Sequence, residues 1–271
     1  MFLPYSSSPS GLKDVTIAAG FPSIIRVDDN TGIGNSVTQV TDGNGNNAPL
    51  KMSEDTLQVV PKDDGNAFEV FSKDSESLIR ANSANDYVTI LGHYANTQYA
   101  YFGVTNTDSA NFADDTHQAI PFGGSNGVGN LSYPPAFGTG TDPATTFTTA
   151  DANGTRASDL VPCLWFVPDK ITIDDIYAFV GADNATGDVH RIHLFQFSFS
   201  SGSTSCLTSG EVIAHSASDT TNAGSEQPYK ETLTKDVTDI AAGKVILAFI
   251  KSDSINSDFS VNIVIKYHNR L

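Results

Sequence analysis

The chain is poor in cysteine and has no long hydrophobic run. Its 271 residues include only two cysteines, Cys163 and Cys206. This is too few for a small disulfide-held scaffold, so we expect both thiols to be reduced and buried. The longest wholly apolar stretch, Val245 to Ile250, is far shorter than the about 20 residues that a membrane-spanning helix needs. We therefore expect no membrane insertion.

Positive charge is also scarce. The chain carries 31 acidic residues against 15 lysines and arginines, which gives a formal net charge of −16. Phosphate backbones and anionic membrane surfaces repel such a protein, so we expect no nucleic-acid partner. The simplest role of the acidity is to keep an abundant protein soluble.

The sequence lacks a recognisable metal or cofactor site. Of its six histidines only His190 and His193 lie close in sequence, and on a strand they point to opposite faces, so they cannot chelate one ion. The run Asp42 to Asn46 is similar to the start of a calcium loop, but Ser53 stands where the bidentate glutamate belongs. We interpret that run as a turn, and we expect no metal and no cofactor.

Catalytic signatures are missing as well. The glycine-rich segment from Gly123 to Gly129 precedes no helix that could present its N-terminus to a phosphate. Adjacent acids such as Asp63 and Asp64 do not face each other across the about 5–10 Å that glycoside hydrolysis requires. The run Gly123 to Gly127 in the glycine-rich segment has the G-x-S-x-G spacing of a nucleophile elbow, but a nucleophile elbow also needs a helix directly after the serine, and the sequence predicts none there. We expect a protein that is not an enzyme.

Short β-like runs alternate with polar turns between Pro49 and Leu91, at steps of about ten residues. A strand with one or two apolar residues cannot offset the entropy of its own ordering, so we expect these stripes to be buried against other copies of the chain. This pattern predicts an elongated fibre shaft in which short strands from several copies of the chain intertwine. Its predicted core residues are Leu50, Met52, Leu57, Val59, Phe68, Val70, Leu78, Val88 and Ile90.

The last third of the chain differs in kind. Its strand-like runs are longer, and in those near Ile192 to Phe199 and Val261 to Tyr267 apolar residues alternate with polar ones. Such alternation is typical of antiparallel sheets packed face to face. We therefore predict an all-β chain that ends in an antiparallel, jelly-roll-like β-sandwich, with Trp165 in its core.

Four segments follow from these patterns. Residues 1–30 form an attachment segment, 31–120 the shaft, 121–157 a Gly/Pro-rich neck and 158–271 the sandwich. The attachment segment contains one apolar stretch, and its candidate contact residues are Val15, Ile17, Phe21, Ile24 and Ile25. Aromatic residues predicted on loops, available for subunit packing or for stacking on sugar rings, are Tyr94, Tyr99, Tyr101, Phe102 and Tyr133.

Taken together, these features resemble the virion fibre and spike proteins of tailed bacteriophages, in particular the short trimeric fibres and head fibres of marine phages. The resemblance rests on the stretch from Gly11 to Asp29, the stepped segment from Pro49 to Ile90, the neck from Phe122 to Pro143 and the sandwich from Val161 to Leu271. It implies a homotrimer with a wound shaft and a terminal knob. The iron-binding H-x-H motif of some tail-fibre tips is absent.

The resemblance implies a structural protein of the virion, assembled in the bacterial cytoplasm. It would attach to capsid or tail proteins through its N-terminus and meet a host glycan or surface protein through exposed loops of the knob. The candidate receptor-binding residues are Asp183, Asn184, Ser201, Ser203, Thr220 and Asn222. Two alternatives are a decoration protein that stabilises the capsid shell and a carbohydrate-active, tailspike-like enzyme.

Overall fold

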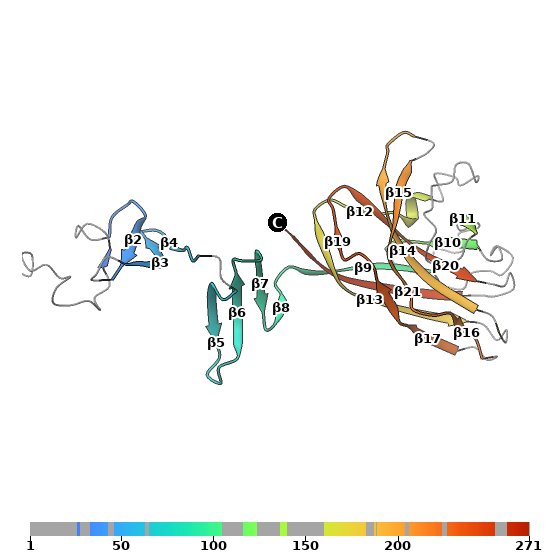
Figure 1. The fold of residues 1–271 in the computed structure, drawn as a ribbon, viewed down its shortest axis with the longest axis horizontal. Helices are drawn as coiled ribbons and strands as arrows, with labels where there is room; N and C mark the ends of the chain where they lie inside the picture. Colours follow the sequence, from blue (N-terminus) through green and yellow to red (C-terminus); the bar gives the residue numbers. More distant parts are fainter. Residues whose placement is uncertain are drawn as a thin grey trace, which may run out of the picture. The chain divides into compact units, whose positions relative to one another are not determined.

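The chain is all-β, as predicted. The computed structural model describes residues 26–27, 33–42, 46–62, 65–104, 116–123, 136–139, 160–182, 187, 189–203, 206–223, 227–252 and 259–270. Over these ranges the regular elements are strands and one 3-10 turn, Val161–Cys163 (Figure 1). This part of the chain contains no helix with the length and hydrophobicity to span a membrane. Two compact units form, Met1–Ala95 (the N-terminal unit) and Asn96–Leu271 (the C-terminal unit).

The N-terminal unit contains two separate four-stranded sheets. The first N-terminal sheet consists of β1 (Arg26–Val27), β2 (Thr38–Thr41), β3 (Asn47–Met52) and β4 (Leu57–Val59). The second consists of β5 (Phe68–Phe71), β6 (Ser77–Asn82), β7 (Tyr87–Ile90) and β8 (His93–Tyr94). Strand order follows sequence order, and all pairs are antiparallel. The predicted strand positions are therefore correct, and each strand pairs with neighbouring strands of its own chain.

Two antiparallel sheets form the C-terminal unit. The large sheet has eight strands. Six follow the order β11-β10-β20-β14-β15-β18, while β12 pairs with β20 and β16 pairs with β14. Its strands are β10 (Thr116–Ile120), β11 (Ala136–Thr139), β12 (Trp165–Val167), β14 (Val189–Phe199), β15 (Leu207–Ser216), β16 (Thr220–Thr221), β18 (Leu233–Lys235) and β20 (Lys244–Ser252). The small sheet has five strands, β17 (Gln227–Glu231), β13 (Ile171–Ala182), β21 (Phe259–Asn269), β9 (Thr97–Val104) and β19 (Asp239–Ile240), the last paired with β13.

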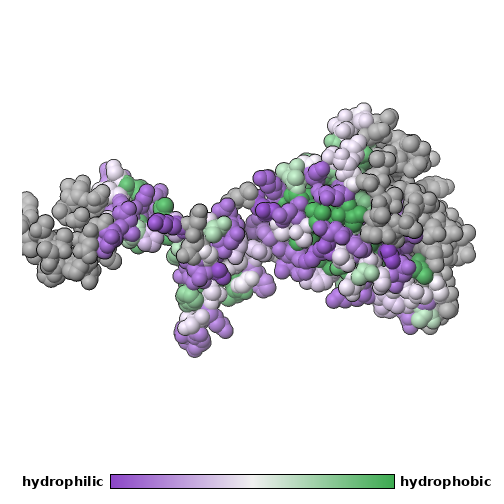
Figure 2. All heavy atoms as spheres, in the orientation of Figure 1, coloured by the Kyte–Doolittle hydropathy of each residue, from purple (hydrophilic) through white to green (hydrophobic). Residues whose placement is uncertain are grey.

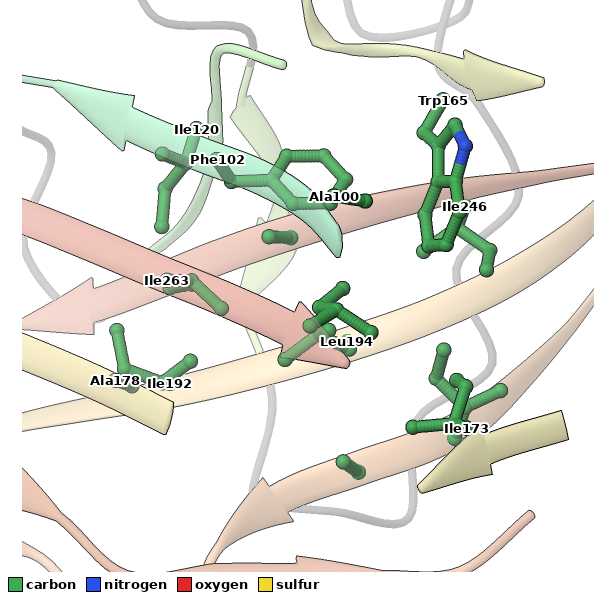
Figure 3. Packing of buried hydrophobic residues seen from close by; sticks show 14 of the residues in the cluster. Ala100, Phe102, Ile120, Trp165, Ile173, Ala178, Ile192, Leu194, Ile246 and Ile263 are labelled. Atoms are coloured by element: carbon green, nitrogen blue, oxygen red, sulfur yellow. The ribbon is translucent and has the colours of Figure 1, made fainter. Parts of the chain in front are cut away.

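The core of the C-terminal unit lies between these sheets. Ile192 and Leu194 from β14 meet Ala178 from β13 and Ile263 from β21, and each is fully buried (Figure 3). The alternation in the sequence thus fills a sandwich from both sides. Trp165 is 6% exposed and belongs to this cluster, which confirms its predicted place in the core.

The large sheet is buried on its other face as well. A second apolar cluster on this face contains Phe195 and Phe197 from β14 and Leu247 and Phe249 from β20, each at most 1% exposed. Cys163 joins it from the 3-10 turn. Burial on both faces explains why β20 is wholly apolar over Val245 to Ile250. Neither Cys163 nor Cys206 forms a disulfide; Cys163 is buried and Cys206 is half-buried.

The unit boundary lies earlier than the sequence indicated. β9 pairs with β21 along its whole length, and β10 pairs with β20, so residues 97–104 and 116–120 belong to the C-terminal unit and not to a shaft. The described parts of the predicted neck lie in this unit too, because Phe122 bridges Phe102 and β11 extends the large sheet from β10. These pairings join segments far apart in the sequence, and local composition carries no signal for them.

Candidate interaction surfaces

The second N-terminal sheet has one apolar face. Residues directly opposite each other on antiparallel strands share a face, and the register aligns two apolar rows across β5, β6 and β7. The first row is Phe68, Ala81 and Val88, and the second is Val70, Ile79 and Ile90.

The opposite face of this sheet is polar. Arg80 lies 3.8 Å from the Glu69 carboxylate and donates a hydrogen bond of 2.9 Å from Nε to the Gly65 carbonyl oxygen. The rings of Tyr87 and Tyr94 meet edge to face, with centroids 5.2 Å apart. Charged side chains favour contact with water, so this face suits exposure to solvent.

The apolar face is open in the single chain. The exposed fractions are 43% for Phe68, 37% for Val70, 38% for Ile79, 43% for Val88 and 48% for Ile90. Figure 2 shows hydrophobic atoms at the surface of β5–β8 among hydrophilic ones. Large exposed apolar patches mark interaction sites in many proteins, so this face is a candidate interaction surface.

The first N-terminal sheet repeats the arrangement. Leu50 lies opposite Val59, and Met52 lies opposite Leu57. Leu57 is 64% exposed and Val59 is 40% exposed, while Leu50 and Met52 are half-buried. The four predicted core residues of this segment therefore share one face, and the single chain leaves that face partly uncovered.

One predicted shaft residue, Leu78, lies on the wrong face. Ile79 and Ala81 stand in register with the apolar residues of β5 and β7, and Leu78, one position away, points to the polar side. A strand has a side-chain period of two, so an error of one residue in register reverses every assignment on that strand. Ile79 is the residue that the sequence analysis missed.

The predicted attachment residues, Val15, Ile17, Phe21, Ile24 and Ile25, lie outside the described residues. The structure begins directly after them, where Arg26 and Val27 pair with Thr41 and Val40. Attachment through this segment stays a prediction.

The predicted receptor loops do not gather at one tip. Ser201 and Ser203 are exposed in the turn that follows β14, whereas Thr220 pairs with His190 near the start of β14. β14 has 11 residues, so these two loops lie roughly 30 Å apart at opposite ends of the sheet. Two further candidates, Asp183 and Asn184, lie outside the described residues.

Asn222 does not face a receptor. It is 1% exposed, its Oδ1 lies 2.8 Å from the Tyr229 hydroxyl, and its carbonyl oxygen accepts a 2.9 Å hydrogen bond from the Gly187 backbone. A buried side chain bound in this way holds the loop together, so we remove Asn222 from the receptor candidates.

A buried polar network ties the two sheets of the C-terminal unit together. His190 Nε2 on β14 lies 3.1 Å from Glu231 Oε1 on β17, and the Ser216 hydroxyl donates to Glu231 Oε2 over 3.3 Å. Burial alone would raise the pKa of Glu231. Hydrogen bonds from His190, Thr220 and Ser216 and the charge of His190 outweigh it, so the pKa lies below its usual value of 4.5.

His193 lies on the other face of β14, where its ring meets that of His117 at a centroid distance of 4.8 Å. The prediction that His190 and His193 diverge is thus confirmed. In the described part of the chain no three His, Cys, Asp or Glu side chains converge to hold a metal. Asp42 accepts hydrogen bonds from the backbone and side chain of Asn46, at 2.8 and 2.7 Å, which fits the interpretation as a turn.

The predicted loop aromatics lie mainly in strands. Phe102 is fully buried on β9, and its ring stands 6.5 Å from that of Trp165. Tyr99 and Tyr101, on the same strand, point to the outer face of the small sheet and are 52% and 46% exposed. Tyr94 belongs to the second N-terminal sheet, and Tyr133 lies outside the described residues.

Comparison with known proteins adds little to this geometry. No protein-family model matches the chain, and no curated protein matches it. One solved structure that matches is that of infectious bursal disease virus Gx strain, with 9% identity, coverage of 71% of this chain and 43% of that chain, and a TM-score of 0.27. The chain spans less than half of that viral chain, and a likeness at this TM-score carries no argument about fold or function.

Proposed function

We propose that the chain is a non-enzymatic structural protein that assembles as a homotrimer through its N-terminal unit, as a fibre or spike on the virion of a tailed bacteriophage. The N-terminal 30 residues would dock to capsid or tail proteins, and the C-terminal unit would be displayed for host attachment. The observation that carries the assembly proposal is the exposed apolar face of the second N-terminal sheet. The virion setting and the number three come from the resemblance noted in the sequence.

A sheet of this kind favours assembly for a physical reason. Short strands are stable only when a hydrophobic face is covered. Covering a half-exposed Val, Ile or Phe side chain contributes on the order of 1 kcal/mol, about half the value for a fully exposed one. The same face occurs on every copy of the chain, so identical copies supply the cover, and joining several C-terminal units multiplies weak contacts to a host surface.

Two adjacent positions on β7 test the assembly. Val88 lies on the apolar face, and Thr89 lies on the polar face opposite Arg80. The variant Val88→Glu places a charge in the proposed interface, and we expect it to abolish the trimer. The matched variant Thr89→Glu places the same charge next to a guanidinium group, and we expect it to leave the trimer intact.

The solution masses of the purified full-length variants are measured by light scattering. Equal masses for the two variants would contradict an interface on this face. A wild-type chain that is monomeric in solution would instead favour the decoration protein, whose apolar faces would be covered by shell subunits.

A further inference from the structure

The outer face of the small sheet carries a platform of aromatic and polar side chains. Tyr177, Val264 and Tyr101 stand in register across β13, β21 and β9. The next rows on the same face are Phe179, Asn262 and Gly103 on one side and Asp175, Lys266 and Tyr99 on the other. Lys230 on β17 extends the Phe179 row. We call this face the aromatic platform.

The rings of the platform are open to solvent and rigidly mounted. Tyr177 is 38% exposed and Phe179 is 46% exposed, comparable to Tyr99 and Tyr101. Four of the residues next to these rings along the strands point inward and are at most 4% exposed, namely Ala100, Phe102, Ala178 and Val180. The core therefore fixes the backbone beneath the rings, and Tyr177 and Tyr101, separated by one strand, are held about 9–10 Å apart.

Polar groups lie between and beside these rings. The Lys230 ammonium stands 5.8 Å from the centre of the Tyr177 ring, and the Tyr177 hydroxyl lies 3.4 Å from Asp175 Oδ2. Asn262 is exposed in the middle of the face, and Lys266 is half-exposed. The platform thus offers flat apolar rings together with amide, hydroxyl and ammonium groups.

We propose that the aromatic platform binds an acidic oligosaccharide. The apolar faces of sugar rings pack on exposed aromatic rings, and sugar hydroxyl groups need the hydrogen-bonding partners that Asn262 and Tyr101 supply. A protein of net charge −16 repels anionic ligands in general. The platform carries Lys230 and Lys266 against one carboxylate, Asp175, which lies 3.6 Å from Lys235 Nζ on β18. The local charge is therefore positive and complements a sugar carboxylate.

A protein partner fits this face less well. Packing a second subunit on it would bury Asn262, Lys230 and Lys266, and buried polar groups are costly without matched partners. The apolar face of the second N-terminal sheet, by contrast, has only Phe, Val, Ile and Ala side chains in its two rows across β5, β6 and β7, and His93 of β8 stands at the edge of one row. A sugar ligand keeps the polar groups hydrogen-bonded and leaves the lysines partly hydrated.

This inference deepens the attachment part of the proposed function. It rests on that function only in taking the host surface as the source of the sugar. The test is affinity electrophoresis of the full-length protein in native gels that contain either alginate, a polymer of uronic acids, or neutral dextran. We expect alginate to retard the wild-type chain and dextran to leave its mobility unchanged. In Tyr101→Ala/Tyr177→Ala we expect the apparent dissociation constant for alginate to rise about tenfold or more.

Two controls separate binding from folding. Phe166→Ala removes another aromatic ring, 56% exposed on β12 of the large sheet, and we expect unchanged retardation. Tyr101→Phe/Tyr177→Phe keeps both rings, and we expect binding within about threefold of the wild type because stacking is preserved. Circular dichroism should give the same fold and light scattering the same mass for all variants. A loss of alginate binding can then be distinguished from a loss of the trimer, which would change the mass.

The outcomes decide the proposal. Retardation by alginate that the double alanine variant loses, with the Phe166 control unchanged, supports it. No retardation of the wild type, equal retardation by alginate and dextran, or undiminished retardation of the double alanine variant overturns it. A double alanine variant that is folded but has lost its oligomeric mass would assign the platform to subunit packing and would also overturn it.

Discussion

Two of the faces that expose hydrophobic side chains, the aromatic platform and the apolar face of the second N-terminal sheet, differ in what lies behind them. The outer face of the small sheet is backed by the core of the C-terminal unit, where Ile263 and Ala178 are fully buried. The apolar face of the second N-terminal sheet is backed by a polar face that carries Glu69 and Arg80. The aromatic platform therefore belongs to a sheet that is already stable, whereas the N-terminal sheet has its hydrophobic residues on the side that is open. We propose that the same two-residue alternation serves ligand contact in one unit and assembly in the other.

The largest effect is expected from removing the N-terminal unit. A fragment of residues 96–271 keeps both sheets of the C-terminal unit and both of its apolar clusters. We expect it to be a folded monomer in light scattering, with cooperative thermal unfolding. A fragment that still forms trimers would place the assembly interface in the C-terminal unit and break the comparison between the two faces.

Substitutions in the two regions should separate stability from assembly. Leu247 is fully buried in the second apolar cluster, so Leu247→Ala should lower the free energy of unfolding by about 2–5 kcal/mol in chemical denaturation. Ile79→Ala, on the open face, should leave the unfolding of the C-terminal unit unchanged and weaken association in dilution series. If Ile79→Ala destabilised the C-terminal unit as much as Leu247→Ala, the two units would not be independent.

A smaller effect is expected at the buried network of the C-terminal unit. Glu231 is 4% exposed, and its pKa is lowered by the hydrogen bonds and the charge around it despite burial. Glu231→Gln weakens these interactions, so we expect it to lower the free energy of unfolding at pH 7 by about 1–3 kcal/mol.

The stabilising effect of the Glu231 charge should depend on pH. A carboxyl group with a lowered folded-state pKa stabilises the fold above its unfolded-state value near 4.5, and that stabilisation is lost as the pH falls through the folded-state pKa. The difference between wild type and Glu231→Gln should therefore shrink in denaturation curves recorded below pH 4.5. A difference that stays constant down to the lowest pH would show that the Glu231 charge does not contribute.

Local patterns predicted the parts of the fold that depend on local chemistry. The strands of the N-terminal unit were placed by apolar pairs between polar turns, and Trp165 by its position in a hydrophobic run. The opposite directions of His190 and His193 follow from the strand period alone. Long-range pairing left no such trace, so β9 and β10 were assigned to the shaft although their partners are β21 and β20.

The candidate surfaces were predicted only in part for the same reason. The sequence predicts Leu78 as the inward residue, whereas the register with β5 and β7 puts Ile79 on the apolar face; this register depends on the neighbouring strands and not on the strand itself. The aromatic platform escaped the sequence analysis because Tyr101 and Tyr177 are brought together by β21, which is distant from both in sequence. Asn222 looked like a loop residue, and its burial depends on the Tyr229 hydroxyl, which comes from another strand.

The solution mass of the full-length wild-type chain, measured by multi-angle light scattering over a dilution series, tests the central claim most directly. The account predicts a mass of three times 28.7 kDa that persists on dilution, because the open apolar faces of the N-terminal unit are covered by identical copies. A mass of 28.7 kDa at every concentration would contradict it.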